Sequence, residues 1–408
     1  MVNPAARARC RSRKLRLATT ALVSVAGFLV SACGHPNASP ARSAATNNVK
    51  VTMTGDGCAL DTTSVSAGPV TFTVANTNAP GITEVELLRD QHIIGEKENL
   101  APGLDPVSFT VTLDGGSYQL YCPGAATEYQ SLTVTGRASA APTGTLASIL
   151  SQGTKDYAAY IVGQIGQLNA AVQGLDAAVQ AGDVAAAKTA YTKARLFWER
   201  AESTVEGFVL PGFAVGDNAG NLDYLIDMRA STPVDAKVGW KGFHAIERDL
   251  WQANAITPTT KALSTELVGN VGKLNGIVAT LQYKPEDLAN GASDLIEEVQ
   301  NTKITGEEEA FSHIDLVDFA GNVEGAQQAY AALRLGLERI DGNLVNQIDQ
   351  QFRAVLSVLD GYREPSALGG YRTYTPALQA SDAAKLTAVI QPLHQSLSTV
   401  AQKVVSAN

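Results

Sequence analysis

Residues 242–251, GFHAIERDLW, combine a helical apolar pattern with two residue types that bind metals. His244 and Glu247 are three positions apart, so a helix presents both side chains on one face. Helical bundles build metal centres from a related pair, Glu-x-x-His, which facing helices project into the core. The order here is His-x-x-Glu, which differs from the His-Glu-x-x-His of zinc proteases. The segment therefore predicts a helix with a metal-ligand pair, and a surface ion pair is the alternative.

Helical patterns surround this segment from about residue 146 to residue 408. Segments rich in Ala, Leu, Gln and Val repeat apolar residues with a period of about 3.6, and candidate caps or breaks separate them. A region of roughly 260 residues can bury a core of its own. We therefore predict an all-α helical bundle over residues 146–408, with helices at residues 157–181, 184–208, 261–281, 316–340, 344–362 and 383–405.

Two further acidic pairs lie in the helical half. Glu199 and Glu202 are at positions i and i+3 of a helix that is otherwise poor in charge, and Asp315 and Asp318 lie beside Leu and Phe residues. Carboxylates among apolar side chains are costly to bury unless they are paired or bind a metal. The alternative for each pair is a solvated face or a helix cap, and Asp315 lies where a helix is predicted to start.

Residues 49–136 show the alternation of β-strands. Short apolar runs at residues 49–53, 70–74, 84–88, 107–111 and 118–121 are separated by turns rich in Gly, Pro and Asn. Several short strands with this spacing predict a small all-β sandwich or barrel. Residues 137–145, rich in Ala, Pro, Gly and Thr, are predicted to link the two domains.

The first 32 residues have the layout of a secretory signal peptide. A basic cluster precedes an apolar run at residues 17–30 that is too short to span a bilayer. The run ends in Val30-Ser31-Ala32-Cys33, which resembles a bacterial lipobox. We therefore expect a lipid on Cys33 and a flexible tether over residues 33–48; cleavage without lipid attachment is the alternative.

Removal of this segment makes the chain strongly acidic. The six cations before Cys33 leave with the signal peptide, which changes the formal net charge from −9 to −15. Nucleic acid is excluded as a partner, because neutralising phosphates needs a basic face. An acidic surface is compatible with attracting cations.

Two cysteines remain for the folded part, Cys58 and Cys122. In an oxidising compartment such a pair usually forms a disulfide, and paired thiolates on a metal are the alternative. The strand before Cys122 resembles the cupredoxin pattern, in which a strand delivers a cysteine to copper. A blue-copper site also needs two histidines, and this domain has only His92, which argues against an electron carrier of that type.

The β domain also carries two carboxylate pairs. Glu84 and Glu86, like Glu96 and Glu98, are two positions apart, so each pair lies on one face of a strand. Carboxylates favour hard cations and thiolates favour soft ones. A mixed cysteine and carboxylate site would suit Cu²⁺ or Fe³⁺, and the alternative is a disulfide beside solvated acidic faces.

Taken together, these motifs resemble the EfeO (imelysin-like) family of bacterial iron-uptake proteins. The resemblance covers nearly the whole mature chain, and it implies a cupredoxin-like β sandwich followed by an imelysin-like helical domain. The motifs that carry it are Gly57-Cys58, Glu84-x-Glu86, Glu96-Lys97-Glu98, Tyr118-x-x-x-Cys122, Glu199-x-x-Glu202, Leu222-Asp223-x-x-Ile226-Asp227-x-Arg229, Gly242-x-His244-x-x-Glu247, Lys303-Ile304-x-Gly306-Glu307-Glu308 and Ser312-His313-x-Asp315-Leu316-x-Asp318.

The resemblance implies an extracytoplasmic component of a ferrous-iron uptake system, with a membrane iron permease and a haem-containing peroxidase as partners. It implies a β-domain site at Cys58, Cys122, Glu84, Glu86 and Glu98, and a helical site at His244, Glu247, Glu199, Glu202 and Asp318. Periplasmic members of the family lack a lipid anchor. The lipobox here would instead hold the chain at the outer face of the cell membrane, beside the permease.

Three functions follow from these observations. The first is a non-catalytic protein that captures iron, as Fe²⁺ or Fe³⁺, and delivers it, with Cu²⁺ as a further candidate in the β domain and Zn²⁺ binding in vitro. The second is a metallopeptidase, although a hydrolytic zinc site usually has three protein ligands and a general base. The third is a structural surface protein that binds no metal tightly.

Overall fold

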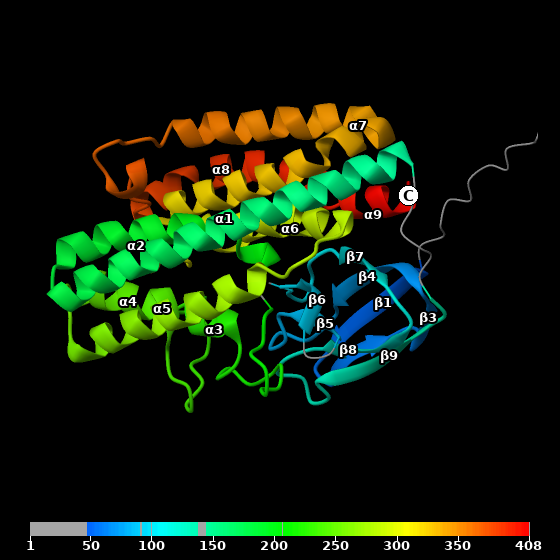
Figure 1. Cartoon of the computed structure of the whole chain (residues 1–408), viewed down its shortest axis with the longest axis horizontal. Coiled ribbons are helices and arrows are strands. Elements are labelled where there is room, and N and C mark those ends of the chain that lie inside the picture. The colour runs from blue at the N-terminus through cyan, green and yellow to red at the C-terminus, as the bar shows by residue number, and fades with distance from the viewer. Residues whose placement is uncertain (1–46, 90–91, 99, 138–143, 206, 408) are drawn as a thin grey trace, which may run out of the picture. The chain divides into compact units, whose positions relative to one another are not determined.

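The computed structural model describes residues 47–89, 92–98, 100–137, 144–205 and 207–407. The predicted signal peptide, Cys33, most of the predicted tether and residues 138–143 of the predicted linker lie outside these ranges. All of the described residues belong to one compact unit, residues 43–408. Figure 1 shows its strands in blue and cyan and its helices in green to red.

The N-terminal part is built from two β-sheets that share a core. One sheet has the strand order β2-β1-β4-β7 and the other has the order β3-β9-β8-β5-β6. Buried Val, Leu and Phe side chains from both sheets form a single apolar cluster, because every second residue of each strand points inward. The strands are β1 (Asn47–Thr54), β2 (Gly57–Leu60), β3 (Ser64–Ser66), β4 (Gly68–Asn76), β5 (Val85–Arg89), β6 (His92–Lys97), β7 (Val107–Leu113), β8 (Gly116–Tyr121) and β9 (Tyr129–Thr135).

A disulfide joins Cys58 in β2 to Cys122, which follows β8. Both side chains are buried in the core of the β domain. The prediction that these two cysteines bind a metal is therefore wrong, because each sulfur is bonded to the other and neither is a free thiolate. The disulfide that the sequence offered as the alternative is the one found.

The C-terminal part is predominantly helical, so the predicted order of an all-β region followed by an all-α region is confirmed. Helices α1, α2, α7 and α8 run beside one another in Figure 1, and α1 contacts α2, α5 and α7. The helices are α1 (Thr145–Ala181), α2 (Val184–Glu199), α3 (Leu222–Asp227), α4 (Gly242–Glu247), α5 (Pro258–Val278), α6 (Pro285–Glu298), α7 (Asp315–Asp360), α8 (Pro376–Leu397) and α9 (Val400–Ser406). Short 3₁₀ turns η1 (Glu202–Thr204) and η4 (Leu368–Gly370) and π-helical turns η2 (Arg248–Gln252) and η3 (Val299–Lys303) complete it.

The observed helix boundaries differ from the predicted ones at several points: α1 begins at Thr145 and not at residue 157, and the helix predicted over residues 383–405 is divided into α8 and α9. The helix predicted over residues 184–208 ends at Glu199, and the short turn η1 follows it. The helices predicted over residues 316–340 and 344–362 form one element, α7, with a kink at Asp341, whose φ of −154° and ψ of 84° are not helical. The chain therefore bends at Asp341-Gly342, and α7 continues beyond this point.

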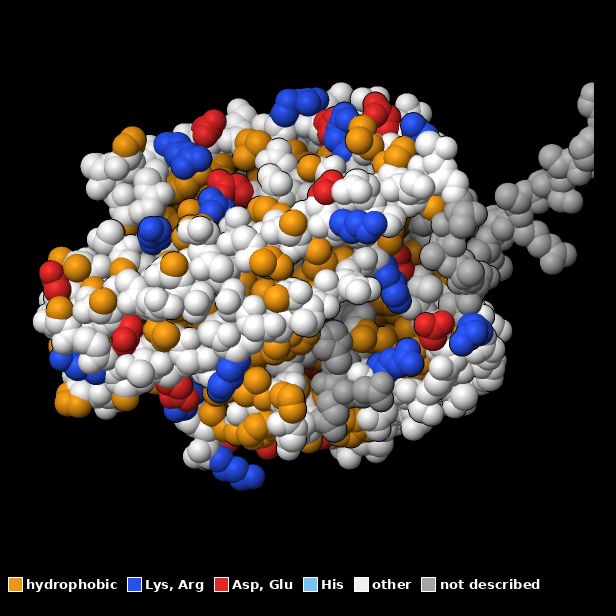
Figure 2. All heavy atoms as spheres, in the orientation of Figure 1, with side chains coloured by type: hydrophobic (Ala, Val, Ile, Leu, Met, Phe, Trp, Pro, Cys, Tyr) orange, Lys and Arg blue, Asp and Glu red, His pale blue; other side chains and the backbone are white. Residues whose placement is uncertain are grey.

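On one face of the molecule, the distribution of charged side chains does not indicate a binding site. On the face shown in Figure 2, acidic and basic side chains are dispersed among apolar and uncharged ones. Within the described ranges, no helix has both the length and the apolar character that crossing a membrane requires.

Candidate metal centre

Helix α4 holds His244 close to the end of α3. Gly242 begins α4 with a φ of 77°, a left-handed conformation that favours glycine. A Cβ atom at this position would lie 2.0 Å from the carbonyl oxygen of Ile226 in α3. The glycine therefore permits the close contact that brings His244 next to Asp227.

The two ring nitrogens of His244 face different partners. Nδ1 lies 3.1 Å from Glu247, while Nε2 lies 3.3 Å from Asp227 and 3.4 Å from Glu308. Nε2 has no hydrogen bond of good geometry with any described residue. The ring is fully buried and is fixed from its Nδ1 side, which leaves Nε2 directed toward two carboxylates.

Glu247 is itself held in place by the backbone. Its Oε1 accepts hydrogen bonds from the N–H groups of Phe311, at 2.8 Å, and Ser312, at 2.6 Å. Carboxylates that accept a hydrogen bond from one histidine nitrogen commonly orient the other nitrogen toward a metal. Glu247 is therefore placed to position the His244 ring.

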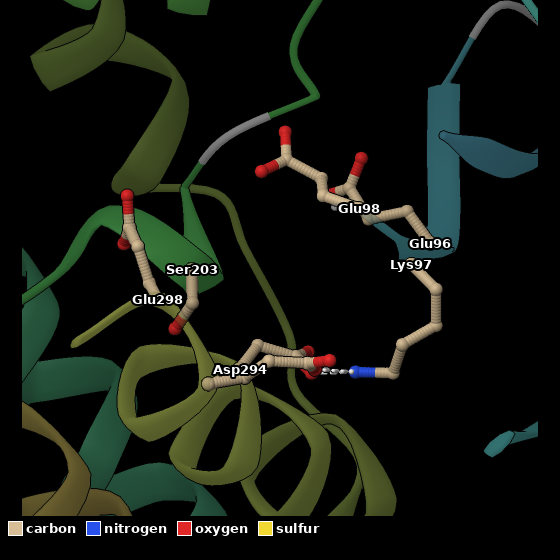
Figure 3. A pocket seen from close by; sticks show the side chains of 7 residues that line it. Glu96, Lys97, Glu98, Ser203, Asp294 and Glu298 are labelled. Atoms are coloured by element: carbon tan, nitrogen blue, oxygen red, sulfur yellow. Dashed lines mark hydrogen bonds and ion pairs between the residues drawn. The ribbon is translucent and has the colours of Figure 1, made fainter. Parts of the chain in front are cut away.

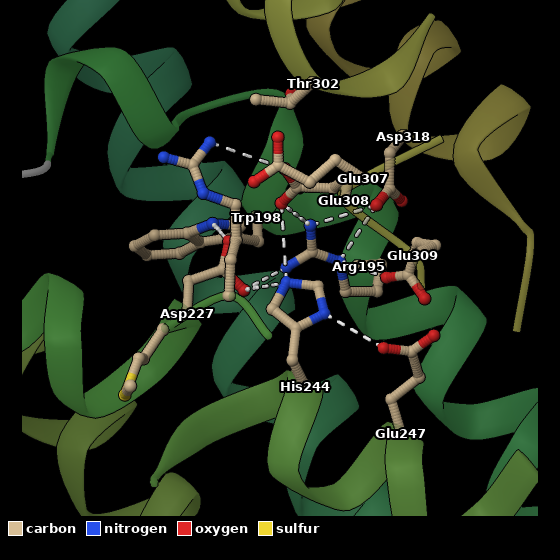
Figure 4. Close-up of polar contacts among 12 residues, drawn as sticks. Arg195, Trp198, Asp227, His244, Glu247, Thr302, Glu307, Glu308, Glu309 and Asp318 are labelled. Atoms are coloured by element: carbon tan, nitrogen blue, oxygen red, sulfur yellow. Dashed lines mark hydrogen bonds and ion pairs between the residues drawn. The ribbon is translucent and has the colours of Figure 1, made fainter. Parts of the chain in front are cut away.

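Arg195 of α2 lies at the centre of this region, as Figure 4 shows. Its guanidinium contacts Glu199 and Asp227 closely and lies 2.9–3.1 Å from the other three acidic partners. These partners come from α2, α3, the loop before α7 and the first turn of α7: Glu199, Asp227, Glu308, Glu309 and Asp318. A single cation thus gathers acidic residues from four segments.

Lys303 is a second buried cation, located at the end of the π-helical turn η3. Its Nζ lies 3.1 Å from Glu199, 3.0 Å from Glu298 and 3.3 Å from Glu308. Both π-helical turns follow helices that carry residues of this centre, and such turns are frequent at functional sites. The wider turn of η3 places the ammonium group of Lys303 inside the acidic cluster.

Carboxylates outnumber cations in this buried centre. Arg195, Lys303 and the imidazole of His244 face six carboxylates, those of Glu199, Asp227, Glu247, Glu308, Glu309 and Asp318. Arg229 reaches one of them, Glu308, from the edge of the centre at 3.6 Å. Buried charges are costly unless they are paired or bind a metal. The excess of negative groups therefore suits an additional cation.

The protonation states reflect this imbalance. Burial disfavours the charged form of His244, but the adjacent Asp227 outweighs burial and raises the histidine pKa well above its usual value. Burial would raise the pKa of Glu308, whereas Lys303 and His244 lower it well below its usual value. Burial dominates at Glu309 and raises its pKa. Both shifts favour an imidazolium at His244 beside an ionised Glu308.

Potential ligand atoms are already close together in this centre. One oxygen each from Asp227 and Glu308 and one nitrogen of His244 lie within 4.8 Å of one another. An imidazole with two carboxylates is a ligand set that iron and zinc accept. All three of these side chains are buried, and none is more than 6% exposed.

A second acidic group lies in the β domain. Glu86 in β5 is paired directly opposite Glu96 in β6, and Glu84 lies on the same face two positions earlier. Like charges directly opposite in a sheet are destabilising. Burial, together with repulsion from Glu84 and Glu98, raises the pKa of Glu86 to about 10. Glu84, Glu86 and Glu96 bring oxygens within 4.8 Å of one another, an arrangement that a cation would stabilise.

A small pocket lies between the end of β6 and α6, next to the acidic group of the β domain. Glu96 and Glu98 line it from the strand, and Asp294 and Glu298 line it from the helix (Figure 3). Its volume of about 40 Å³ admits water or a metal ion. Lys97 joins the two elements by ion pairs with Asp294 and with Glu297, the latter at 2.9 Å.

Residues 153–400 match the profile of the imelysin family. The chain belongs to the EfeO imelysin-like family. The protein named "Iron uptake system component EfeO" is 32% identical over 390 residues in Escherichia coli K12 and in Shigella flexneri, covering 94% of this chain and 96% of each relative.

The match to EfeO relatives spans both the β and the helical parts. The relative from Escherichia coli O6:K15:H31 is 31% identical over the same share of the chain. A solved structure from Parabacteroides distasonis matches 65% of this chain and 96% of its own chain, with a TM-score of 0.46 and 15% identity.

Most of the predicted imelysin-like site residues lie in or beside the buried centre. His244 and Glu247 are in contact, and Glu199 and Asp318 join them through Arg195. Glu202 lies apart from the His244 ring and groups with Glu199 and Glu298 instead. In the β domain, Glu84 and Glu86 cluster with Glu96, while Glu98 lies 3.7 Å from Arg229.

Sequence reasoning did not assign Arg195, Asp227, Lys303, Glu308 or Glu309 to the site. Arg195 and Glu199 are four positions apart and resemble an ordinary ion pair on a helix surface. Residues 307–309 form an acidic run of the kind usually found in solvent. The family motifs could have indicated three of these residues, because Asp227, Lys303 and Glu308 all belong to motifs that carry the resemblance to EfeO.

Proposed function

We propose that this chain is an extracytoplasmic, non-catalytic iron-binding component of an iron uptake system. The observation that carries the proposal is the buried His244 centre, whose carboxylates outnumber its cations and whose Nε2 faces Asp227 and Glu308. The name of the EfeO relatives supports iron as the cargo. A structural role alone would not account for so many buried, incompletely neutralised acidic groups.

His244, Asp227 and Glu308 would bind the iron in this centre, and Glu247 would fix the orientation of the imidazole. The set offers one nitrogen and carboxylate oxygens, so it suits Fe²⁺ or Fe³⁺ and would also accept Zn²⁺ in vitro. The ligands are at most 6% exposed, which favours holding a small ion over binding a polypeptide substrate. This burial is the physical reason for preferring iron binding over peptide hydrolysis.

The carboxylates of the β domain would hold a second ion. The disulfide between Cys58 and Cys122 removes the thiolates that favoured Cu²⁺. Glu84, Glu86 and Glu96 offer oxygen ligands, which favour hard cations such as Fe³⁺ over copper. We therefore propose that this group binds iron and that Glu98 lies at its edge, next to Arg229.

The partners follow from the family resemblance. We propose that the chain hands its iron to a membrane permease and works with a haem-containing peroxidase of the same system. The EfeO relatives are named as a component of an iron uptake system, and a component of such a system has other members. The acidic pocket between β6 and α6 is a route by which a cation would enter.

An anaerobic titration of the metal-stripped protein with Fe²⁺ tests the function. We expect at least one site with a dissociation constant of about 1 µM or tighter, equivalent to about 8 kcal/mol of binding free energy. Cells that lack the chain should also accumulate radiolabelled iron more slowly, and the wild-type gene should restore the rate. If the protein does not bind iron tightly and cells that lack it take up iron normally, the proposal is refuted.

Lipid attachment at Cys33 is a separate proposal. In cells supplied with labelled palmitate, we expect the wild-type chain to carry the label and to sediment with membranes. A Cys33→Ser variant should be unlabelled, because a lipobox cysteine supplies the sulfur that receives the lipid. Equal labelling of both proteins, or equal sedimentation of both, would exclude Cys33 as the anchor.

A further inference from the structure

Arg229 is a third cation beside the buried centre, and it is held more loosely than the other two. It lies in the loop between α3 and α4, and its side chain is 21% exposed. Its guanidinium lies 3.6 Å from Glu308, 3.7 Å from Glu98 and 3.7 Å from Glu298. Contacts of this length are ion pairs and are too long to be hydrogen bonds. Arg229 is therefore attracted to three carboxylates, and none of these contacts fixes its position.

Arg195 and Lys303 are anchored much more firmly. Both side chains are at most 1% exposed. Arg195 donates hydrogen bonds to four carboxylates, and Lys303 Nζ lies 3.0–3.3 Å from three. A metal ion brings more positive charge into the centre, so the cation that is held least firmly is the one that moves. That cation is Arg229, which has the longest contacts and is partly open to solvent.

Glu308 places Arg229 next to the proposed metal ligands. Its Oε1 lies 3.4 Å from Nε2 of His244, while its Oε2 lies 3.6 Å from the guanidinium of Arg229. This Oε2 has no hydrogen-bond partner within the described part of the chain. A metal ion bound by His244 and Glu308 would therefore add its charge close to Arg229. Like charges repel one another more strongly in a buried site than in water.

We propose that Arg229 is a displaceable counter-ion of the His244 centre, which neutralises Glu308 in the metal-free protein and moves toward Glu98 when a metal ion binds. Glu98 is 39% exposed, compared with 15% for Glu298 and none for Glu308, so it is the outermost of the three carboxylates. In Figure 3, Glu98 extends from the end of β6 and Glu298 from α6. This inference rests on the proposed function, because it requires a metal ion at His244.

Such a movement would couple the helical centre to the β domain. Glu98 follows β6, so its ion pair with Arg229 joins the two domains. When a metal ion displaces Arg229 from Glu308, the pair with Glu98 becomes the stronger contact of the guanidinium. Coupling between two such events is reciprocal. Glu98 therefore favours metal binding at the centre by accepting the displaced arginine, although it is not a ligand there.

Calorimetric titration of the metal-stripped protein with Zn²⁺ tests this role, read at the site that His244→Ala abolishes. We expect Arg229→Met to bind Zn²⁺ at least about tenfold more tightly than wild type, because the competing charge is absent. Arg229→Lys keeps the charge and should stay within about threefold of wild type. Arg200→Met is the matched control, since Arg200 is 22% exposed and pairs with Glu324 at 2.6 Å, and it should leave the affinity unchanged.

A double-mutant cycle separates displacement from a general effect of charge. Glu98→Gln should weaken Zn²⁺ binding at the same site by about three- to tenfold when Arg229 is present. In the Arg229→Met background the same change should have no effect, because no arginine needs to be accepted. A direct attraction between Glu98 and the metal ion would persist in that background and would contradict the coupling.

Crystals of the wild-type protein with and without Zn²⁺ give an answer that needs no variant. We expect Arg229 beside Glu308 in the metal-free form and beside Glu98 in the metal-loaded form. Unchanged Zn²⁺ affinity in Arg229→Met, or an Arg229 that stays beside Glu308 in the loaded crystal, would overturn the inference and leave the proposed function intact. Failure of the wild type to bind any metal at His244 would refute the proposed function and this inference with it.

Discussion

Replacing His244 by alanine should weaken Fe²⁺ binding by at least about a hundredfold, which corresponds to about 2.8 kcal/mol. The imidazole supplies the one nitrogen of the proposed ligand set, and its Nε2 faces Asp227 and Glu308 at 3.3 and 3.4 Å. Without it, the remaining carboxylates repel one another and no neutral ligand offsets that repulsion. Anaerobic calorimetry of the metal-stripped wild type and variant measures the difference directly.

Two further variants separate ligation from positioning. Glu247→Gln keeps the shape of the side chain but weakens its hold on Nδ1, so we expect a smaller loss, of about ten- to a hundredfold, as for other groups that orient a ligand. His394→Ala removes a histidine that lies 3.6 Å from Glu297, and should leave iron affinity unchanged. Equal Fe²⁺ affinity in wild type and His244→Ala would leave a structural surface protein as the better interpretation.

The sequence predicted the principal ligand because the pattern is local. His244 and Glu247 are three residues apart in a segment with a helical period, and α4 places both on one buried face. The order of the two domains was also predictable, since alternation of period two changes to a period near 3.6 at about residue 146. Local periodicity determines such features, so one sequence is sufficient to predict them.

The rest of the centre depends on contacts between distant segments. Asp227 ends the short helix α3, and the close approach of Gly242 to α3 brings it to His244. Glu308 and Glu309 belong to an acidic run whose burial depends on Arg195, more than a hundred residues earlier. No local pattern indicates that an acidic run will turn inward to meet a cation from another helix.

The β domain shows the same division between local and long-range information. Glu84 and Glu86 were predicted to share a face because strands alternate with a period of two. The pairing of Glu86 with Glu96 depends on the register between β5 and β6, which spacing alone does not specify. The sequence also could not choose between a disulfide and two thiolate ligands, since a sequence separation of 64 between Cys58 and Cys122 carries no information on their distance in space.

Replacing Arg195 by methionine should reduce the free energy of unfolding by about 3–5 kcal/mol at pH 7, the usual cost of removing one partner from a buried ion pair. Methionine fills much of the volume but leaves five carboxylates without their shared cation. Arg334→Met is the control, because Arg334 pairs with Asp349 at 2.6 Å but is 37% exposed. The control should lose less than about 1 kcal/mol, as exposed ion pairs do.

The pH dependence of this loss follows from Asp227. Burial would raise the pKa of Asp227, but Arg195 and His244 lower it below its usual value. A lowered pKa stabilises the fold above the ordinary aspartate pKa, and that stabilisation is lost as the pH falls through the folded-state pKa. In the wild type this stabilisation is present at both pH 7 and pH 5. Without Arg195, burial acts on the carboxyls unopposed by that cation and they take up protons more readily, so the variant regains stability and its difference from wild type should shrink from pH 7 to pH 5. Urea unfolding at both pH values measures this difference. Saturating Zn²⁺, which the centre is proposed to accept in vitro, should restore part of the lost stability by binding the folded state. A variant as stable as wild type at pH 7, or a loss that does not change with pH, would mean that Arg195 does not neutralise the centre.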